Sequence, residues 1–525
     1  MFKYSELQPE FKPVLMGIFF IRMKTGWVVS GCCVYCSIIG NDRKDPMTTP
    51  PKSLKTAFAP EPFRHLGHAL IDRLADYLTV SQSRDYPTVL PAITPDQMLT
   101  RWDDNFQEEG DEAFGQIIDR VLRDSHNLQH PRYIGHQCCP PLPVSALCDL
   151  VGNLINNASA VYEMGPVNVA MERQMIAWMA SLAGWSAAAD GVFTHGGTIG
   201  NLTALLAARQ AMTDYDIWTE GVRDDKKLAV LVSEQCHYSL KRAVAILGLG
   251  EEAVYLVPTD KDYHITAEGL AAQHAKALAD GRTPFALVAN GCSTATGSYD
   301  DLEMASTFCR QHRLWLHVDG AHGASALLSP RYRHRLKGID KADSLVWDAH
   351  KMMMVSALAT AVIFREGHHS YEAFSQKASY LFESHAQDEW YNYAHRTVEC
   401  TKSMIGIKLY VPLKVYGVGL FREHIEYTHD LAAAFAAHLK ATPDFELAVV
   451  PESNIVCFRY LPGDDRDLNA LQLKLRRQVL ESEKYYIVQT RLDEKQWLRV
   501  TLIHPLSTLE DLTGLLDQIR TLAKD

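Results

Sequence analysis

The stretch Leu314-Trp315-Leu316-His317-Val318-Asp319-Gly320-Ala321-His322 predicts a buried strand that delivers a carboxylate at its C-terminal tip. Further along, Trp347-Asp348-Ala349-His350-Lys351-Met352-Met353 follows the apolar run 344–347 and delivers a lysine. In open α/β sheets, ligands bind outside the carboxyl ends of the strands. The two stretches therefore predict that Asp319 and Lys351 meet at one edge of a sheet.

The region around these stretches has the pattern of an α/β domain. From about residue 190 to 365, β-rich runs such as 228–233 and 285–289 alternate with helical patterns. That alternation predicts a mostly parallel sheet covered by helices. A long helical pattern near 402–440 is followed by a small α+β region, whose strands we expect over 454–460 and 497–502.

Length, charge and cysteine content exclude several classes of protein. A chain of 525 residues is longer than a single hydrophobic core usually serves, so two or three domains are expected. Its net charge of -11, without a basic cluster, disfavours nucleic acid and anionic membranes as partners. Eleven cysteines do not make a disulfide framework in so long a chain, and their spacing matches no zinc site. We therefore expect a cytoplasmic protein without a metal.

The N-terminal part of the chain divides into a leader and a helical arm. Residues 14–39 are rich in apolar side chains, but Arg22 and Lys24 interrupt them before the roughly 20 residues that a membrane-spanning helix needs. We interpret residues 1–46 as an uninformative, disordered or mis-assigned leader. Residues 63–78 have apolar side chains at helical spacing, and a second helical segment covers 114–122. Such an arm must bury its apolar stripe, and we expect it to do so on a second subunit.

The lysine and the aspartate match the needs of pyridoxal phosphate (PLP), which takes an amine for its Schiff base and an acidic partner for its ring nitrogen. The run 193–202 leads from a glycine-containing turn into a helix, whose free N–H groups favour an anion. Alone, this run could equally be a plain turn. His237 follows the apolar run 228–233 and could stack on an aromatic cofactor or be an ordinary loop histidine.

The order of these motifs resembles that of the group II PLP-dependent amino acid decarboxylases, over residues 58 to 520. Within that family the sequence is most similar to the glutamate and cysteine sulfinate decarboxylase branch. The segments that carry the resemblance are Tyr162–Val167, Gly196–Asn201, Ser233–His237, Tyr332–Ile339, Asp348–Lys351 and Ala378–Phe382.

The resemblance implies PLP fold type I, the aspartate aminotransferase-like architecture. Its large domain has a mostly parallel seven-stranded sheet, and a small C-terminal α+β domain follows. We expect the leader over 1–46, the helical arm over 47–145, the large PLP-binding domain over 146–410 and the small domain over 411–525. PLP binds at a subunit interface in such enzymes, so a homodimer is expected.

The resemblance also implies roles for individual residues. Lys351 would form the Schiff base and Asp319 would pair with the ring nitrogen, while His237 and Ala321 would lie on opposite faces of the ring. The remaining cofactor contacts would come from Gly197, Thr198 and His350 at the phosphate and Thr294 near the phenolic oxygen.

Reaction and substrate are less sharply indicated. Carbon reprotonation after loss of CO₂ needs a placed acid, and the Tyr/His-rich segment 389–395 offers Tyr393, which we favour slightly, or Tyr391. Arg499 matches an arginine that contacts substrate carboxylate. His136 stands near the position where the glutamate branch has a glutamine that helps to hold the distal carboxylate of the substrate. His136 could donate to such an acid or could face a different side chain.

We expect an L-amino acid α-decarboxylase that acts on an acidic amino acid (glutamate, aspartate or cysteine sulfinate) or on 2,4-diaminobutyrate. The alternatives are an aldehyde-forming oxidative decarboxylase, an aromatic amino acid decarboxylase, a lyase or an aminotransferase. A non-catalytic member kept for complex formation would need none of Lys351, Asp319 and His237.

Overall fold

The computed structural model describes residues 50–104, 110–374 and 389–524. By its internal contacts the chain divides into two compact units, residues 1–69 and 70–525. The described part of the first unit holds α1 (Lys52–Ala57) and the start of α2 (Pro60–Ser81). α2 confirms the helix expected over 63–78. The leader expected over 1–46 lies outside the described residues, as does the resembling stretch 378–382.

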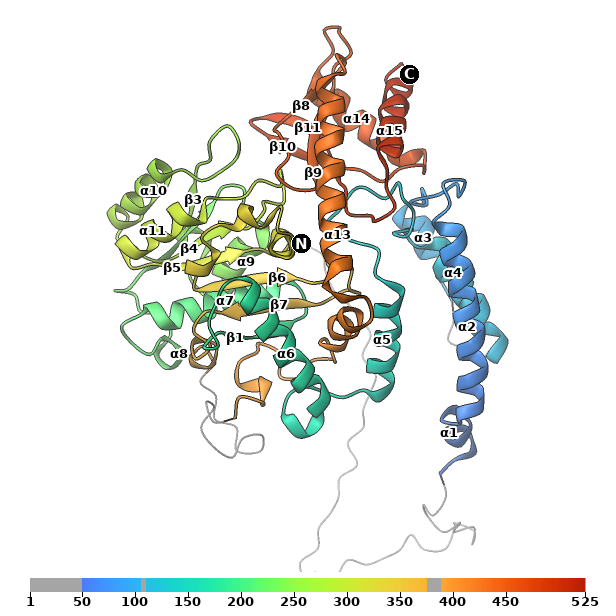
Figure 1. Ribbon diagram of the computed structural model, residues 1–525, viewed down its shortest axis with the longest axis horizontal. Helices are drawn as coiled ribbons and strands as arrows, with labels where there is room; N and C mark the ends of the chain where they lie inside the picture. The colour runs from blue at the N-terminus through green and yellow to red at the C-terminus, as the bar shows by residue number, and fades with distance from the viewer. Residues whose placement is uncertain (1–49, 105–109, 375–388, 525) are drawn as a thin grey trace, which may run out of the picture. The chain divides into compact units, whose positions relative to one another are not determined.

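A seven-stranded sheet forms the centre of the second unit, with the strand order β1-β7-β6-β5-β4-β2-β3 (Figure 1). Its strands are β1 (Asp190–Thr194), β2 (Leu228–Ser233), β3 (Val254–Val257), β4 (Thr283–Asn290), β5 (Trp315–Asp319), β6 (Ser344–Asp348) and β7 (Thr360–Phe364). β3, β2, β4, β5 and β6 run parallel, whereas β7 is antiparallel to β6 and β1 is antiparallel to β7. The expected seven-stranded, mostly parallel sheet is confirmed.

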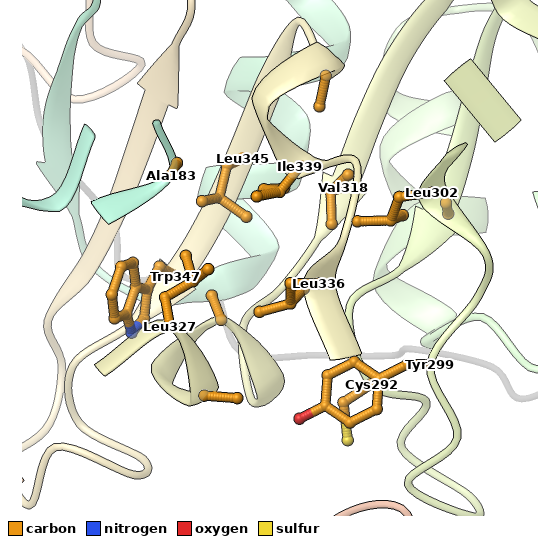
Figure 2. Packing of buried hydrophobic residues seen from close by; sticks show 14 of the residues in the cluster. Ala183, Cys292, Tyr299, Leu302, Val318, Leu327, Leu336, Ile339, Leu345 and Trp347 are labelled. Atoms are coloured by element: carbon orange, nitrogen blue, oxygen red, sulfur yellow. The ribbon is translucent and has the colours of Figure 1, made fainter. Parts of the chain in front are cut away.

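Both faces of this sheet are buried. Successive side chains of a strand point to opposite faces, and those of β5 fall into two different apolar clusters. Leu316, Val318 and Leu345 belong to one apolar cluster, part of which Figure 2 shows around Trp347. Trp315 and the neighbouring even-numbered positions of β4 belong to a second cluster. Strands buried on both faces are nearly continuous apolar runs, and this is why they could be recognised in the sequence.

Helices cover both faces. α6 (Pro166–Leu182), α10 (Ala267–Ala279) and α11 (Leu302–His312) contribute to the first cluster, and α7 (Gly197–Met212) and α9 (Tyr238–Ile246) to the second. The other helices of the second unit's first part are α3 (Pro95–Arg101), α4 (Asp111–Asp124), α5 (Pro143–Ile155), α8 (Ile217–Glu220) and α12 (His369–Glu372).

The C-terminal part is α+β, as expected. The long helix α13 (Ile407–Lys440) bends at Gly417, whose φ of 72° is not helical. A four-stranded antiparallel sheet follows, in the order β10-β11-β9-β8. Its strands are β8 (Phe445–Leu447), β9 (Ile455–Tyr460), β10 (Val488–Leu492) and β11 (Lys495–Thr501), and the helices α14 (Leu468–Glu481) and α15 (Leu509–Leu522) accompany them (Figure 1).

Among the described residues, no helix combines the length and the apolar character that crossing a bilayer requires.

Candidate active site

A cavity of about 200 Å³ opens where β4, β5 and β6 end and α7 begins. This is the carboxyl edge of the parallel strands, where ligands of α/β sheets bind. Its lining residues are Gly197, Thr198, Asn201, His237, Ser239, Asn290, Cys292, Thr294, Asp319, Ala321, His322, Asp348 and Lys351.

Lys351 lies next to two carboxylates in this cavity. Its Nζ is 3.1 Å from Oδ2 of Asp348, which also accepts a hydrogen bond at Oδ1 from the Thr360 hydroxyl at 2.5 Å. Burial lowers the pKa of the Lys351 amine, but the negative charges of Asp348 and Asp319 outweigh burial, and the net shift of the pKa is upward. Burial raises the pKa of Asp348, and Lys351 and His350 more than reverse that effect. Without a ligand, the amine is therefore held as an ammonium ion.

Asp319 stands at the tip of β5 with 8 % of its surface exposed. Its Oδ2 accepts a hydrogen bond from Nδ2 of Asn201 at 3.0 Å, and its Oδ1 accepts one from the backbone N–H of Ala321 at 3.2 Å. Both donors are neutral. Asp319 thus faces the cavity with a negative charge available for a cationic group of a ligand.

The start of α7 forms an anion seat beside the two acids. Gly196 precedes the helix with a φ of 101°, a conformation that favours glycine. The first N–H groups of a helix have no acceptor within it, so those at Gly197 and Thr198 can receive an anion. A Cβ at position 197 would stand 3.4 Å from the Asp348 carboxylate and 3.7 Å from Cβ of Ala321, which would narrow this seat.

His237 lies at the N-terminal cap of α9, where its Nδ1 is 2.8 Å from the Ser239 hydroxyl and accepts the Ser239 backbone N–H. Burial lowers its pKa, and Asp319 partly offsets this effect. At neutral pH the ring is therefore a neutral, flat surface at the cavity, suited to stacking on an aromatic ligand.

The cavity contains two buried polar atoms without a protein partner: Nδ2 of Asn290, which is a donor, and Nδ1 of His322, which is an acceptor. His322 donates from Nε2 to Asn454 at 2.7 Å, and burial together with Lys351 lowers its pKa to about 3. Unsatisfied buried groups in a lined cavity indicate a polar ligand. With an amine, a carboxylate, an anion seat and a stacking ring, the site fits PLP.

Three expected residues lie beside the cavity rather than in its lining. His350 reaches Asp348, with its Nε2 3.6 Å from Oδ2. Arg499 of β11 is 7 % exposed and donates from Nη1 to the carbonyl oxygen of Thr294 at 2.6 Å. His136 is exposed. Partial desolvation of its ring is the main cause of its lowered pKa, and the positive charge of Arg499 is the second cause.

Tyr393, the residue expected to donate the proton to carbon, is buried and is not part of the cavity lining. Its side chain is 0 % exposed, packs against Val169 and Val192, and donates its hydroxyl hydrogen to the carbonyl oxygen of Val169 at 3.1 Å. Burial raises the pKa of this phenol well above its usual value. A hydroxyl committed in this way cannot reach a substrate without unpacking the segment. Tyr391 is half-buried against Tyr162 and is not part of the cavity lining either.

The residues that sequence reasoning left without a role are Asn201, Ser239, Asn290, Cys292, His322 and Asp348. Asn201 was visible as a polar residue within an Ala/Leu-rich helix, and Asp348 as the acid that ends β6 next to the lysine. Elsewhere, His368, His369 and Glu372 at α12 have possible metal-ligand atoms within 4.8 Å of one another, outside the cavity lining.

The sheet order and the site define the chain as a fold-type-I PLP enzyme. The pyridoxal-dependent decarboxylase conserved domain matches residues 95–461, and the chain belongs to that family. It is similar to the acidic amino acid decarboxylase GADL1 of Xenopus tropicalis, with 30 % identity over 82 % of this chain and 87 % of that protein. An aromatic-L-amino-acid decarboxylase of Bacillus atrophaeus is 27 % identical over 89 % of this chain and 96 % of its own length. The crystal structure of mouse CSAD in its apo form has a TM-score of 0.82 at 26 % identity and covers 89 % of this chain and 100 % of that one.

The chain is therefore a PLP-dependent amino acid decarboxylase, a carboxy-lyase of amino acid metabolism, and a member of the group II family.

Asp348→Asn tests the electrostatic control of Lys351. Because Asp348 raises the pKa of the amine, the variant should have a lower Lys351 pKa and more neutral amine at pH 8. The rate at which an acylating reagent modifies Lys351 in the apo-protein, followed by peptide mass spectrometry, should rise. Glu303→Gln, which removes a partner of the surface residues Lys337 and Lys341, should leave that rate unchanged. An unchanged rate in Asp348→Asn would show that Asp348 does not control the amine.

Tyr393→Phe tests whether Tyr393 donates the proton to carbon. Because its hydroxyl is bonded to Val169 in this structure, the variant should keep decarboxylase activity within about threefold and lose about 0.5–1.5 kcal/mol of folding stability. Tyr391→Phe, measured in parallel, asks whether the other candidate tyrosine carries the proton. A loss of about a hundredfold or more in kcat, confined to Tyr393→Phe, would establish Tyr393 as the donor.

Proposed function

We propose that this decarboxylase acts on an acidic L-amino acid, removes its α-carboxylate as CO₂ and releases the corresponding amine. The observation that carries the proposal is a pair of arginines around His136 and Tyr486, whose ring centroids are 5.7 Å apart. The charges of Arg499 and Arg476 both act on these two rings, and Arg499 also reaches the cavity through Thr294. The Nε atoms of both arginines are buried without a partner.

Two guanidinium groups suit a substrate with two acidic groups, because Arg offers donors in a fork that matches a carboxylate. We assign the α-carboxylate to Arg499, which bonds the cavity residue Thr294, and the distal acid to Arg476 and His136. A cationic side chain such as that of 2,4-diaminobutyrate would meet like charges there. The similarity to an acidic amino acid decarboxylase supports the same choice.

An aromatic substrate is the second candidate. The rings of Tyr133 and Tyr486 stack at 5.2 Å, and His126 packs on both, so an aromatic surface lies next to the cations. The similarity to an aromatic-L-amino-acid decarboxylase favours this alternative. Because each of these rings already packs against the others, we rank an aromatic substrate below an acidic one.

In the proposed reaction the bound cofactor supplies an electron sink for the pair left at Cα when CO₂ departs. Lys351 would hold the cofactor, Asp319 would pair with its protonated ring nitrogen, and Gly197, Thr198 and His350 would receive its phosphate. His237 and Ala321 would lie on the two faces of the ring, and Thr294 near its phenolic oxygen. Asp348 would pair with the Lys351 ammonium whenever that amine is free. The overall reaction consumes one proton for each CO₂ formed.

We propose domains over 47–145 (helical arm), 146–410 (PLP-binding) and 411–525 (small domain). Strands β1 to β7 all fall in the second range and β8 to β11 in the third, which supports the division. We also propose a cytoplasmic location, since each cysteine among the described residues is a free thiol.

We further propose that the enzyme is a homodimer. α5 exposes Leu147, Leu150, Val151, Leu154 and Ile155, which recur at the spacing of a single helix face with 42–64 % of each surface accessible. A continuous apolar stripe of this kind needs a partner surface. In cyclic dimers the same patch serves both copies, so a second copy of this chain is the simplest occupant.

The substrate assignment predicts a panel result. Purified enzyme with PLP should release CO₂ and an amine from glutamate, aspartate or cysteine sulfinate with a higher kcat/KM than from 2,4-diaminobutyrate, tryptophan or L-Dopa. Arg476→Gln should raise KM for the acidic substrate by about ten- to a hundredfold, the loss of one charged hydrogen bond. Arg477→Gln, its exposed neighbour on α14, should not. A preference for an aromatic substrate, or an aldehyde and ammonia as products, would contradict the proposal.

The dimer proposal predicts that Leu154→Glu halves the mass measured by sedimentation, because a charge in the centre of the stripe is costly to bury. Leu278→Glu on α10, where the leucine is 53 % exposed, should keep the mass of the unaltered protein. A monomeric unaltered protein, or a dimer that Leu154→Glu leaves intact, would refute it.

A further inference from the structure

Asn201 makes hydrogen bonds with all the polar groups of its side chain, although it lies in the apolar first turns of α7 and is 1 % exposed. Its Nδ2 donates to Oδ2 of Asp319 at 3.0 Å and to the hydroxyl oxygen of Ser239 at 3.2 Å. Its Oδ1 is 3.0 Å from Nε2 of His317. One amide thus joins the acid of the cofactor site to two separate polar groups.

The direction of each hydrogen bond follows from the types of the groups. An ionised carboxylate only accepts hydrogen bonds, so the amide nitrogen of Asn201 must face Asp319. The opposite orientation would place Oδ1 against a negative oxygen. Oδ1 then faces His317, and Nε2 of His317 must carry a hydrogen to donate to it.

His317 itself is neutral, because complete burial lowers its pKa to about 4. With its one hydrogen on Nε2, its Nδ1 is a bare acceptor, 2.8 Å from the hydroxyl of Ser344. Ser344 donates to that nitrogen and accepts from Nε1 of Trp315 at 2.8 Å. The indole N–H can only donate. Every bond from Trp315 to Asp319 therefore points the same way.

A shorter branch reaches His237. Ser239 accepts from Asn201, so its own hydroxyl hydrogen is free to go to Nδ1 of His237 at 2.8 Å. This leaves the hydrogen of the His237 ring on Nε2. The backbone N–H of Ser239 donates to the same Nδ1 and favours the same tautomer, so the amide of Asn201 is oriented consistently with both Asp319 and His237.

We propose that Asn201 is a positioning residue for the cofactor, held in orientation by the relay Trp315, Ser344 and His317. The inference rests on the roles proposed above for Asp319 and His237. Aligned neutral donors strengthen one another and fix the position of the Asp319 carboxylate without supplying a positive charge. The carboxylate is thereby held where the ring nitrogen of the cofactor would meet it.

Other titratable groups also act on Asp319, and the test must hold them fixed. Those that interact with it through charge are Lys351, His237, His317, Cys236 and Cys292. A change at Ser344 removes the partner of Nδ1 of His317, which is the relay bond under test, and keeps the other four groups and Asp319 itself unaltered.

Ser344→Ala, paired with Ser325→Ala, makes the decisive comparison. Ser325 is buried and accepts from Nε1 of Trp347 at 2.8 Å, the same contact that Ser344 makes with Trp315, but it is not part of the relay. Both variants leave a tryptophan N–H without its acceptor, and Ser344→Ala also leaves Nδ1 of His317 unpaired, so its melting temperature should fall somewhat further. Only Ser344→Ala should weaken PLP binding to the apo-protein, by about tenfold. Ser344→Thr, which keeps the hydroxyl, should restore the affinity.

The second measurement is the nitrogen-15 chemical shift of the ring nitrogen in labelled PLP bound to each protein. In Ser344→Ala the shift should move toward the unprotonated value, because a less firmly held Asp319 carboxylate is a poorer partner for the protonated ring nitrogen. Equal affinities and shifts in Ser344→Ala and Ser325→Ala would overturn the relay. Asp319→Asn distinguishes a failure of the relay from a failure of the proposed role of Asp319. If this variant leaves the ring-nitrogen shift unchanged, the role of Asp319 is wrong. If Asp319→Asn moves the shift and Ser344→Ala does not, only the relay is wrong.

Discussion

The structure depends on one electrostatic arrangement: a buried ammonium, Lys351, held between the carboxylates of Asp348 and Asp319 at the ends of adjacent strands. Burying these charges singly would be costly, and together they are compensated. Asp348 follows β6 directly into the lysine turn, and Asp319 ends β5, so strand pairing brings the three groups to one edge of the sheet. With the roles proposed above, cofactor binding would replace part of this pairing, because Lys351 would join the cofactor and Asp319 would gain a cationic partner in the ring nitrogen.

The surrounding fold keeps this arrangement rigid and partly dry. α7 contributes the anion seat with its first turn and the Asn201 amide one turn later. A single helix therefore supplies the anion seat and also the amide that bonds Asp319. Arg499 enters from β11 of the C-terminal sheet and bonds Thr294 at the cavity. The large sheet thus sets the charges of the cavity, and the C-terminal sheet contributes the cation of Arg499 beside it.

Much of the cofactor site could be predicted, because its residues directly follow apolar runs that are buried on both faces. Asp319, Thr294 and Lys351 were found in this way, and their common cavity agrees with the expectation. The antiparallel direction of β7 was not visible, since a short apolar run has the same pattern in either direction. The burial of Tyr393 could not be predicted, because an aromatic-rich segment does not reveal which ring is buried, and here Val169 accepts its hydroxyl hydrogen. The relay through His317 escaped notice because it joins α7, β5 and β6 side by side, a proximity that spacing along the chain does not encode.

The central claim is that Lys351 is the residue that binds the cofactor. Borohydride reduction of the PLP-loaded enzyme, followed by proteolysis and mass spectrometry, fixes the cofactor covalently on whichever lysine holds it. The account predicts a single pyridoxyl-modified peptide containing Lys351. Modification of another lysine instead, such as the buried Lys402 or Lys408, would contradict it.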